Sequence, residues 1–322
     1  MTPLHPGDQL DHYRLDALVA RSGMAQIFRA TDLRTGVRVA IKVPHPEMEC
    51  DPLYFDRFER EKRIGQEMDH PAVIKVLPED DPSRVYMTLE WVKGKPLREL
   101  LVPEEKFPVK RAVRIALGIL DALEYVHGQG VIHRDLKPEN IMVDARDHVK
   151  LIDFGLAGKR GSRRLTFGRF TQLTGTPDYI SPEQVKGKRG DARSDLYAAG
   201  VILFEMLTGL APFQGPNPLA VMNARLHRDA PPVRQVAAEV PPELEEILVR
   251  ALERDPVHRY ATAGEFAGDL RHPERVAAVP RVPRQKRTLG QFPMARQFLF
   301  YSGLAMIPLT IFALLLYVAG HA

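Results

Sequence analysis

The sequence predicts an α+β protein of two lobes, in which a small β-rich part with one helix precedes a larger, mainly helical part. Short segments with alternating or β-branched apolar residues occur in residues 13–92, and such segments are typical of strands. Longer segments with apolar residues at helical spacing occur in residues 93–270. Strands followed by helices predict this architecture, and residues 298–319 add one apolar helix.

The composition is that of a globular chain. Of 322 residues, 44% are hydrophobic and 27% are charged, so the chain can bury a large core. A single cysteine, Cys50, excludes an intrachain disulfide framework and a zinc site of clustered cysteines. The net charge of +4 and the pI of about 9.1 are compatible with a nucleic-acid binder, a membrane-surface protein or an ordinary solvated surface.

The first lobe is predicted to hold a small sheet that carries one helix. Two short strands are expected within residues 13–29, and a third over residues 38–43, where β-branched residues are enriched. Spaced apolar residues in a charged segment predict a helix over residues 56–68. Alternation over residues 84–92 predicts another strand, which places the joint between the lobes near residues 90–94.

The second lobe is predicted to be built from long amphipathic helices. Three such segments lie at residues 109–127, 195–208 and 244–254. Beyond residue 270 the chain is rich in proline and arginine and has little periodicity, so residues 271–297 are expected to form an exposed linker.

Residues 298–319 carry no charge and would, as a helix, cross a hydrocarbon core of about 30 Å. The alternative is a buried helix of the core, which fits so long an apolar run poorly. Basic residues are frequent before the run, so the positive-inside rule predicts a single-pass helix in the cell membrane with the preceding lobes in the cytoplasm. Its partner would be membrane lipid, and the basic stretch could also bind anionic head groups.

One polar run in the second lobe carries the most specific functional pattern. It reads His-Arg-Asp-Leu-Lys-Pro-Glu-Asn at residues 133–140, and Asp153-Phe154-Gly155 follows it. Phosphoryl transfer needs a residue that holds the acceptor hydroxyl, oxygen ligands for a metal, and a cation on the phosphates. The two segments resemble the catalytic loop and the metal-binding segment of protein kinases.

This resemblance implies a role for each polar residue of the two segments. Asp135 would orient the substrate hydroxyl and accept its proton, and Lys137 would contact the transferred phosphate. Asn140 and Asp153 would coordinate Mg²⁺ through oxygen atoms, with ATP as the phosphoryl donor. Lys137 together with Thr176 matches the pattern of serine/threonine kinases and differs from that of tyrosine kinases.

A lysine and a glutamate upstream extend the resemblance. Val39-Ala40-Ile41-Lys42 is similar to the strand that carries the phosphate-binding lysine of the family, and Glu61 follows in the predicted helix. The resemblance implies an ion pair of Lys42 with Glu61 that aligns the nucleotide. Alone, the two would be an ordinary strand lysine and one charge of a solvated helix face, but the catalytic segments favour the functional interpretation.

The phosphate-binding loop departs from the family pattern. Where the family has Gly-x-Gly-x-x-Gly, this chain has Ala20, Ser22 and Ala25, and Gly23 is the one glycine within the loop. Glycine lets backbone amides approach phosphates closely and permits positive φ. Because small residues occupy all three positions, we expect these four residues to form a working ATP-binding loop with a modified lid.

The resemblance also places an adenine pocket at the joint between the lobes. Ile27, Ala40 and Met142 would surround the ring, and the hinge from Glu90 to Val92 would bind it through backbone hydrogen bonds. Leu89 would be the gatekeeper. These apolar side chains would also pack as part of the hydrophobic core, since an adenine pocket is an extension of the core.

Gly65 is a second departure, because the family usually stacks an apolar side chain four residues after the glutamate of the ion pair. A glycine inside a helix costs about 1 kcal/mol relative to alanine. Gly65 could leave the helix mobile and make the engagement of Glu61 conditional, or it could reflect close local packing, which is the interpretation we favour.

Residues 175–183 resemble the platform that supports a protein substrate, which small-molecule kinases usually lack. Thr176 would contact the catalytic loop. Glu183 and Arg259 would form a buried ion pair that braces the platform, and Asp195 would brace the backbone of the catalytic loop.

The segment before the platform has the composition of an activation loop, with serines and threonines among basic residues. Thr171 is the leading candidate for autophosphorylation, and Arg134 could receive the phosphate. The alternative is that Thr171 is an ordinary polar loop residue.

Together these motifs identify residues 13–270 as a member of the eukaryotic-like serine/threonine protein kinases of bacterial type, with a first lobe over 13–92 and a second over 93–270. The implied partners are ATP, Mg²⁺ and proteins with serine or threonine acceptors. Nucleic-acid binding is rejected because no aromatic interleaving accompanies the basic residues. A homodimer stays open, as does the rival class of a membrane-tethered pseudokinase scaffold that binds nucleotide or partners without turnover.

Overall fold

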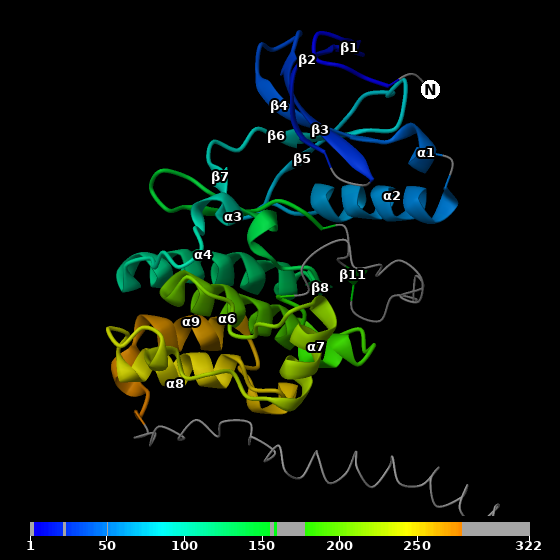
Figure 1. Cartoon of the computed structure of the whole chain (residues 1–322). Helices are drawn as coiled ribbons and strands as arrows, with labels where there is room; N and C mark the ends of the chain where they lie inside the picture. The colour runs from blue at the N-terminus through cyan, green and yellow to red at the C-terminus, as the bar shows by residue number, and fades with distance from the viewer. Residues whose placement is uncertain (1–2, 22–23, 50, 155–157, 160–177, 279–322) are drawn as a thin grey trace, which may run out of the picture. The chain divides into compact units, whose positions relative to one another are not determined.

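The first lobe is built on an antiparallel sheet, which the computed structural model shows at one end of the described chain (Figure 1). The structure describes residues 3–21, 24–49, 51–154, 158–159 and 178–278. Within these ranges the sheet has the strand order β1-β2-β3-β4-β6-β5. The strands are β1 (Gln9–Leu10), β2 (Tyr13–Arg21), β3 (Ala25–Asp32), β4 (Arg38–Pro44), β5 (Val76–Leu77) and β6 (Met87–Glu90).

The strands of this sheet differ in length from those that the sequence predicts. The first hairpin, β2 and β3, is longer, because cross-strand pairing continues from Tyr13↔Asp32 to Arg21↔Gln26. Strand β6 is shorter than the predicted 84–92, since the chain leaves the sheet after Glu90 to enter the second lobe. One face of the sheet buries its own apolar cluster, in which Leu15, Phe28 and Ile41 are fully enclosed.

The described residues of the first lobe form two helices where the sequence predicts one. The short α1 (Pro46–Glu49) precedes α2 (Pro52–Gln66), which packs beside β5 and lies below the sheet in Figure 1. Helix α2 begins earlier than predicted because Asp51 caps it, accepting a 2.9 Å hydrogen bond from Leu53 N. Pro52 then occupies the first turn, where its missing N–H costs nothing.

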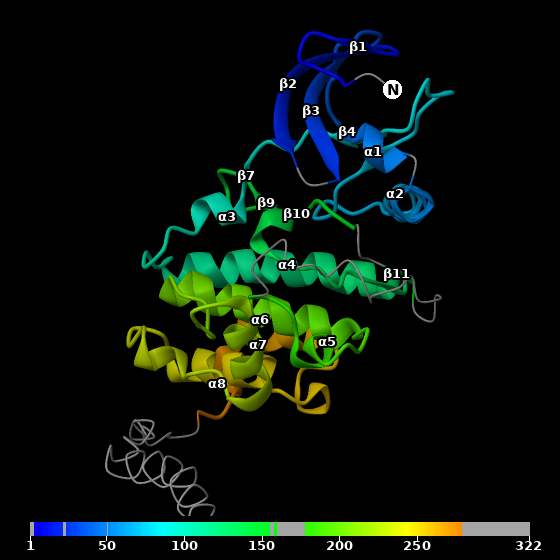
Figure 2. The ribbon, with the colours of Figure 1, turned by 45° about the vertical axis from the view of Figure 1, so that its right-hand side comes forward.

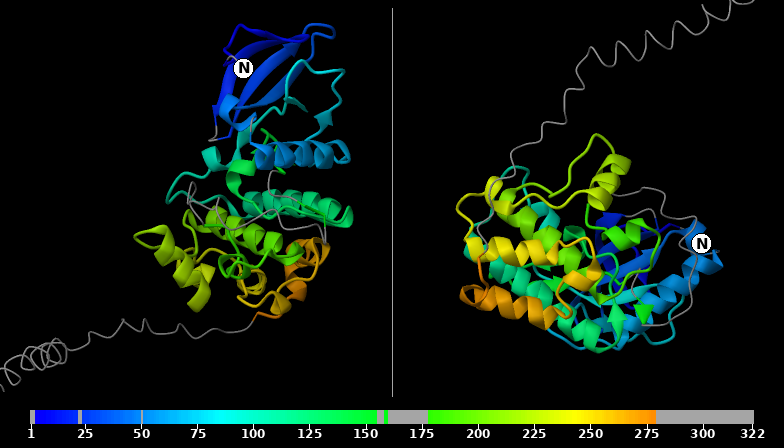
Figure 3. Two further views of the ribbon diagram at one scale, coloured as in Figure 1. Left: turned by 90° about the vertical axis from the view of Figure 1, so that its right-hand side faces the viewer. Right: turned by 90° about the horizontal axis from the view of Figure 1, so that it is seen from below.

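The second lobe is helical, as the sequence predicts (Figure 3). Its central helix is α6, which is buried at every position from Ser194 to Thr208, begins at the capping residue Asp191, and ends at Gly209 in a left-handed conformation with φ +72°. The α-helices around it are α3 (Leu97–Leu100), α4 (Val109–Gly128), α5 (Pro182–Val185), α7 (Pro218–His227), α8 (Pro242–Ala251) and α9 (Ala263–Arg271). Short 3₁₀ turns are η1 (Pro138–Asn140), η2 (Val233–Gln235), η3 (Pro256–His258) and η4 (Pro273–Arg275).

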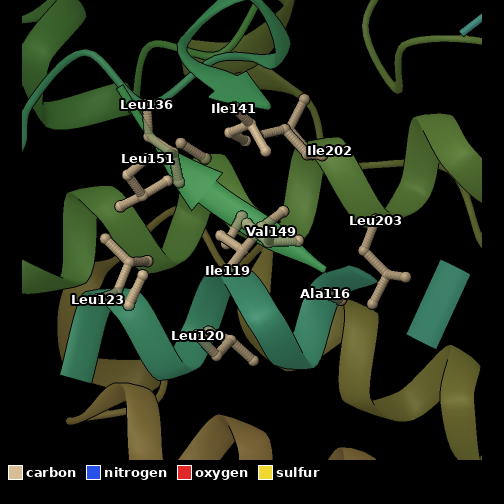
Figure 4. Close-up of a cluster of buried hydrophobic side chains, with 14 of the residues drawn as sticks. Ala116, Ile119, Leu120, Leu123, Leu136, Ile141, Val149, Leu151, Ile202 and Leu203 are labelled. Carbon is tan, nitrogen blue, oxygen red and sulfur yellow. The ribbon is translucent and has the colours of Figure 1, made fainter. Parts of the chain in front are cut away.

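The described part of the second lobe also holds two small sheets, and Figure 2 shows the strands β7, β9 and β10 of one of them above α4. In one, β9 (Ile141–Val143) lies between β7 (Lys95–Pro96) and β10 (Val149–Leu151), and in the other β8 (Val131–Ile132) pairs with β11 (Gly158–Lys159). Figure 4 shows the apolar contacts that hold the first of these on α4 and α6, with Val149 and Leu151 packed over Ile119 and Leu123. The segment 133–140 therefore runs between anchored strands.

Strand β10 is joined to the first lobe by hydrogen bonds close to the joint. Ile74 N donates to Leu151 O at 2.8 Å, and Leu151 N donates to Ala72 O at 2.9 Å. Lys150 Nζ, on β10, donates to Glu90 Oε1, on β6, at 2.6 Å. The strand that leads to Asp153 is thereby tied to the first lobe.

Within the described ranges, no helix combines the length and the apolar character needed to cross a membrane. The predicted membrane helix at 298–319, and the linker from residue 279 onward, lie outside the described residues.

Candidate active site

The catalytic loop is held by a carboxylate that comes from the centre of the second lobe. Asp195, fully buried on α6, accepts hydrogen bonds from His133 N at 2.9 Å and Arg134 N at 2.7 Å, and His127 Nε2 lies 2.8 Å from it. Burial alone would raise the pKa of Asp195, but the hydrogen bonds and the neighbouring histidines outweigh it and lower that pKa.

The same carboxylate stabilises an unusual backbone conformation. Arg134 has φ +67°, a left-handed conformation that is sterically unfavourable for a residue with a β-carbon. The bond from Arg134 N to Asp195 Oδ1 and the bond from Gln184 Nε2 to Arg134 O hold both polar backbone atoms of this residue. The turn presents the next residue, Asp135, at the surface between the lobes.

Asp135, Lys137 and Asn140 form one connected group. Lys137 Nζ donates to Asp135 Oδ2 at 2.8 Å, and Asn140 Nδ2 donates to Asp135 O at 2.9 Å. The side chain of Asp135 is 33% exposed, so a hydroxyl can reach its carboxylate. Burial would lower the pKa of Lys137, but the charge of Asp135 raises it, and the lysine stays cationic beside the carboxylate.

Asn140 and Asp153 offer oxygen ligands of the kind that Mg²⁺ prefers. The amide nitrogen of Asn140 is taken by Asp135, so its oxygen is the atom left for a ligand. The carboxylate of Asp153 is 39% exposed. No group of three or more His, Cys, Asp or Glu gathers in a metal-binding arrangement within the described part of the chain. The pair therefore fits a Mg²⁺ that also uses phosphate oxygens, as this ion commonly does.

Lys42 and Glu61 form the ion pair that the resemblance implies. Lys42 Nζ on β4 lies 2.5 Å from Glu61 Oε1 on α2 and 3.7 Å from Asp153 Oδ1. Burial opposes the charge of Lys42, but the two carboxylates outweigh it and raise the pKa of Lys42. The ammonium thus stays charged and links the first lobe to the segment that follows β10.

Behind this pair, α2 approaches the sheet very closely at Gly65. A β-carbon at residue 65 would overlap Cγ2 of Val76 on β5. The side chain of Val76 therefore occupies the space that a larger residue of α2 would need. This geometry supports close packing over a loosened helix as the reason for the glycine.

The residues predicted to line an adenine pocket lie on strands β3, β4 and β6 of the first lobe and on β9 of the second lobe. Ala40 on β4 pairs with Leu89 on β6, and both are buried, whereas Ile27 on β3 and Met142 on β9 are half-buried. Ala40 and Leu89 belong to one hydrophobic cluster that reaches from one lobe into the other, and Ile27 packs against that cluster. In the hinge, Val92 is half-buried.

The side chain of Glu90 at the start of the hinge accepts hydrogen bonds from Lys150 Nζ and, at 2.8 Å, from Lys75 N. Sequence reasoning missed this role of Lys150.

Of the phosphate-loop positions, Ala20 is exposed near the end of β2 and Ala25 is buried at the start of β3. Ser22 and Gly23 lie outside the described residues.

The predicted substrate platform is anchored by buried charges. Arg259 Nη1 and Nη2 donate to the two carboxylate oxygens of Glu183 at 2.9 and 2.8 Å, and Ser194 Oγ donates to Glu183 Oε1 at 2.6 Å. Burial would raise the pKa of Glu183, but Arg259 and Ser194 outweigh it and lower that pKa. Thr176 lies outside the described residues.

Two supports of this platform carry no motif in the sequence. Gln184 bonds the backbone of the catalytic loop, and the fully buried Arg225 of α7 donates through Nη2 to Asp178 O. Arg225 also stacks over the ring of Phe213 at 5.4 Å. Its role could have been suspected only from a lone arginine within an apolar stretch of α7.

Three arginines from separate elements gather next to the catalytic loop. Burial lowers the pKa of Arg134 to about 10, and the charges of Arg189 and Arg60 add to that effect. Arg60 lies on α2 and Arg189 lies between α5 and α6. The charges of Arg60 and Arg189 therefore act on Arg134, the residue predicted to receive a phosphate. Thr171, the predicted phosphorylation site, lies outside the described residues.

Comparison with known proteins agrees with this geometry. The chain matches the family described as "Protein kinase domain" over residues 13–268. It is 38% identical over 263 residues to a probable serine/threonine-protein kinase of Streptomyces coelicolor, covering 80% of this chain and 39% of the relative. It is 39% identical over 270 residues to the serine/threonine-protein kinase pkn3 of Myxococcus xanthus, covering 80% and 49%.

A further relative is the serine/threonine-protein kinase PknB of Mycolicibacterium smegmatis, 35% identical over 274 residues that cover 84% of this chain and 43% of the relative. The chain thus spans less than half of the length of these three relatives. The crystal structure of the kinase domain of Mycobacterium tuberculosis PknI superposes with a TM-score of 0.64 and 23% identity, covering 84% of this chain and all of that one. At this sequence identity, the similarity between the two structures supports a shared fold and nothing further.

Proposed function

This chain belongs to the protein kinase family, and we propose that it transfers the γ-phosphoryl group of ATP, with Mg²⁺, to serine and threonine hydroxyls of proteins. One observation carries the proposal. Lys42 Nζ lies between the carboxylates of Glu61 and Asp153, at 2.5 and 3.7 Å, so a lysine for phosphate binding and a candidate metal ligand meet at the joint of the lobes.

The other residues take roles that their contacts support. Asp135 orients the acceptor hydroxyl and takes its proton, and Lys137, bonded to Asp135, neutralises charge on the transferred phosphate. Asn140 and Asp153 hold Mg²⁺, which when bound neutralises charge on the phosphates of ATP. Ile27, Ala40, Met142 and the hinge hold the adenine ring, and residues of the β2–β3 turn cover the phosphates.

The test is phosphorylation by the full chain supplied with Mg²⁺ and labelled ATP. Asp135→Asn and Lys42→Met should each lower incorporation by about 10²-fold or more, since each removes a group that acts on the reacting atoms. Asp121→Asn and Lys110→Met, at exposed positions of α4, are matched controls that should retain activity. Equal incorporation by the wild type and the first two variants would contradict the proposal.

The pseudokinase alternative is not favoured. Two departures from the family pattern would favour it, the altered glycine loop and Gly65. Close packing against Val76 accounts for Gly65. The chain has Lys42, Asp135, Asn140 and Asp153 in place, and its relatives are named as serine/threonine-protein kinases. A chain that bound ATP with Mg²⁺ but gave no phosphorylated product would restore this alternative.

Autophosphorylation of Thr171 forms part of the proposal. The arginine cluster of Arg60, Arg134 and Arg189 supplies the positive charge that a phosphothreonine needs, and Arg60 directly precedes Glu61 on α2. A phosphate bound there would favour the position of α2 in which Lys42 is paired. Mass spectrometry of active enzyme should find Thr171 phosphorylated, and an unmodified Thr171 in fully active enzyme would remove the assignment.

We also propose that residues 298–319 anchor the chain in the cell membrane as a single-pass helix, with the kinase domain in the cytoplasm and residues 271–297 as the tether. Support comes from the uncharged run and the basic residues before it. No residue pattern in the sequence of this helix supports a homodimer. Deleting residues 298–319 should move the chain from the membrane fraction to the supernatant.

A further inference from the structure

Two consecutive residues of α2 pair with charged groups elsewhere in the first lobe. Glu61 pairs with Lys42 on β4. The next residue, Lys62, donates through Nζ to Glu79 Oε2, and Glu79 lies in the connection between β5 and β6. Successive side chains of an α-helix leave it about 100° apart, so the two ion pairs hold different sides of α2 and together oppose its rotation. We call the second one the Lys62/Glu79 pair.

The Lys62/Glu79 pair is largely withdrawn from water. The side chain of Glu79 is 1% exposed and that of Lys62 is 17% exposed. Lys62 Nζ also donates to Tyr86 O at 3.4 Å. Water screens such charges little, so their attraction is stronger than that of an ion pair at the surface. The neighbouring Arg63, by contrast, is exposed. Lys62 therefore belongs to the packed side of α2 and not to its solvated face.

Glu79 connects this contact to the strand beside Lys42. Its other oxygen, Oε1, accepts a 2.6 Å hydrogen bond from Thr88 N on β6. Strand β6 pairs with β4, the strand that carries Lys42. The contacts form a closed ring, which runs from Lys42 through the two consecutive residues of α2 to Glu79 and back through β6 to β4. A shift of α2 away from the sheet would break both ion pairs of this ring.

The contact at Gly65 leaves the position of α2 incompletely fixed. Gly65 has no side chain, and Val76 of β5 fills the space beside it. This contact sets how closely α2 approaches the sheet, but a glycine has nothing that interlocks with the strands and prevents sliding or rotation. Hydrogen bonds between charged groups are directional and can prevent both. The two ion pairs of α2 take that role.

We propose that Lys62 is a positioning residue of the kinase reaction: through Glu79 it holds α2 in the position in which Glu61 pairs with Lys42. The inference rests on the proposed kinase activity and adds to it a residue that acts through Glu61 and not on the reacting atoms. Lys62→Met should lower kcat by about 10-fold, because a small misplacement of a group near the reaction is costly. It should change the KM for ATP less, because the adenine pocket is untouched.

The test measures steady-state phosphorylation by the full chain with varied ATP. Lys62→Met removes the cation, whereas Lys62→Arg keeps it and should retain most of the wild-type kcat. Glu79→Gln keeps an oxygen for Thr88 N but loses the charge, so it should lower kcat as Lys62→Met does. Arg63→Met is the matched control, because it removes an exposed cation from the same helix, and it should behave like the wild type.

A double-mutant cycle distinguishes positioning from a general loss of stability. Glu61→Gln has already lost the ion pair with Lys42, so adding Lys62→Met to it should lower kcat no further. A lysine with a merely structural role would lower kcat by the same factor with and without Glu61→Gln. Thermal melting of every variant sets a temperature at which all of them are folded, and the kinetics are measured there.

Hydrogen–deuterium exchange supplies a readout that needs no turnover. Backbone amides of α2 should exchange about 10-fold faster in Lys62→Met than in the wild type, because the helix is released from Glu79. Amides of α6, which is buried in the second lobe, should exchange at the wild-type rate. Lys62→Arg and Arg63→Met should leave the exchange of α2 unchanged.

The two readouts separate the inference from the kinase activity. Faster exchange confined to α2 in Lys62→Met, without phosphorylation by any form of the chain, would support the hold of Lys62 on α2 and contradict the activity. Phosphorylation with the same kcat in Lys62→Met and the wild type would overturn the inference. So would an equal loss of kcat with and without Glu61→Gln, or an exchange that quickens in α2 and α6 alike.

Discussion

Glu183 and Arg259 lie 76 residues apart in the chain and meet in a two-pronged ion pair in which the arginine side chain is wholly enclosed. The pair joins the substrate platform to the turn after α8, and Ser194 at the start of α6 completes the coordination of the carboxylate. The predicted platform therefore depends on a part of the chain that is distant from it in sequence.

Arg259→Met should unfold more easily than the wild type by about 3–5 kcal/mol, because it leaves the buried carboxylate of Glu183 without its cation. The measurement is denaturant unfolding of the full chain. Arg254→Met is the matched control, since Arg254 pairs with Asp229 at 3.0 Å on the surface and should change stability by less than about 1 kcal/mol. Equal effects of the two substitutions would contradict the prediction.

Glu61→Gln should lower kcat/KM by about 10²-fold with little change in stability. The amide keeps the shape of the side chain but lacks the negative charge that pairs with Lys42. Steady-state kinetics with varied ATP tests this. Asp56→Asn, an exposed position on the same helix, should behave like the wild type. Unchanged kinetics in Glu61→Gln would show that the ion pair is dispensable.

Gly65→Ala should destabilise the fold, although alanine favours a helix by about 1 kcal/mol, because the new methyl group would overlap Val76. Adding Val76→Ala should restore part of the loss, and a double-mutant cycle from melting curves measures the coupling. At Gly268 on α9 no atom lies within 4 Å of an added β-carbon, so Gly268→Ala should be neutral or stabilising. A stabilised Gly65→Ala would count against close packing.

Asp195→Asn should reduce stability at neutral pH and progressively less below about pH 4. The pKa of Asp195 is lower in the folded chain than its ordinary value of 3.8, so the folded state favours the carboxylate. The resulting stability is complete above the unfolded pKa and is lost as the pH falls through the folded one. Unfolding of the wild type and the variant from pH 7 to pH 2.5 measures the difference, and a constant difference would refute this account.

Much of the fold follows from local patterns. The period of the apolar residues distinguishes the strands of the first lobe from the helices of the second, and the two-lobed architecture is confirmed. Element ends were predicted less well. Helices α2 and α6 begin at Asp51 and Asp191, capping residues that the apolar period does not reveal. The short α1 escaped prediction because four residues are too few to show a period.

The chemical groups of the candidate site can be identified from the sequence: the aspartate, lysine and asparagine of the catalytic loop, Asp153 and Lys42 occur in one recognisable order. The surroundings of these groups become visible in the folded chain. Asp195 reaches the catalytic loop from α6, Lys150 holds Glu90 across the joint, and Arg225 supports Asp178. Such contacts depend on how distant helices and strands pack around a shared core, and no local period of the chain encodes that packing.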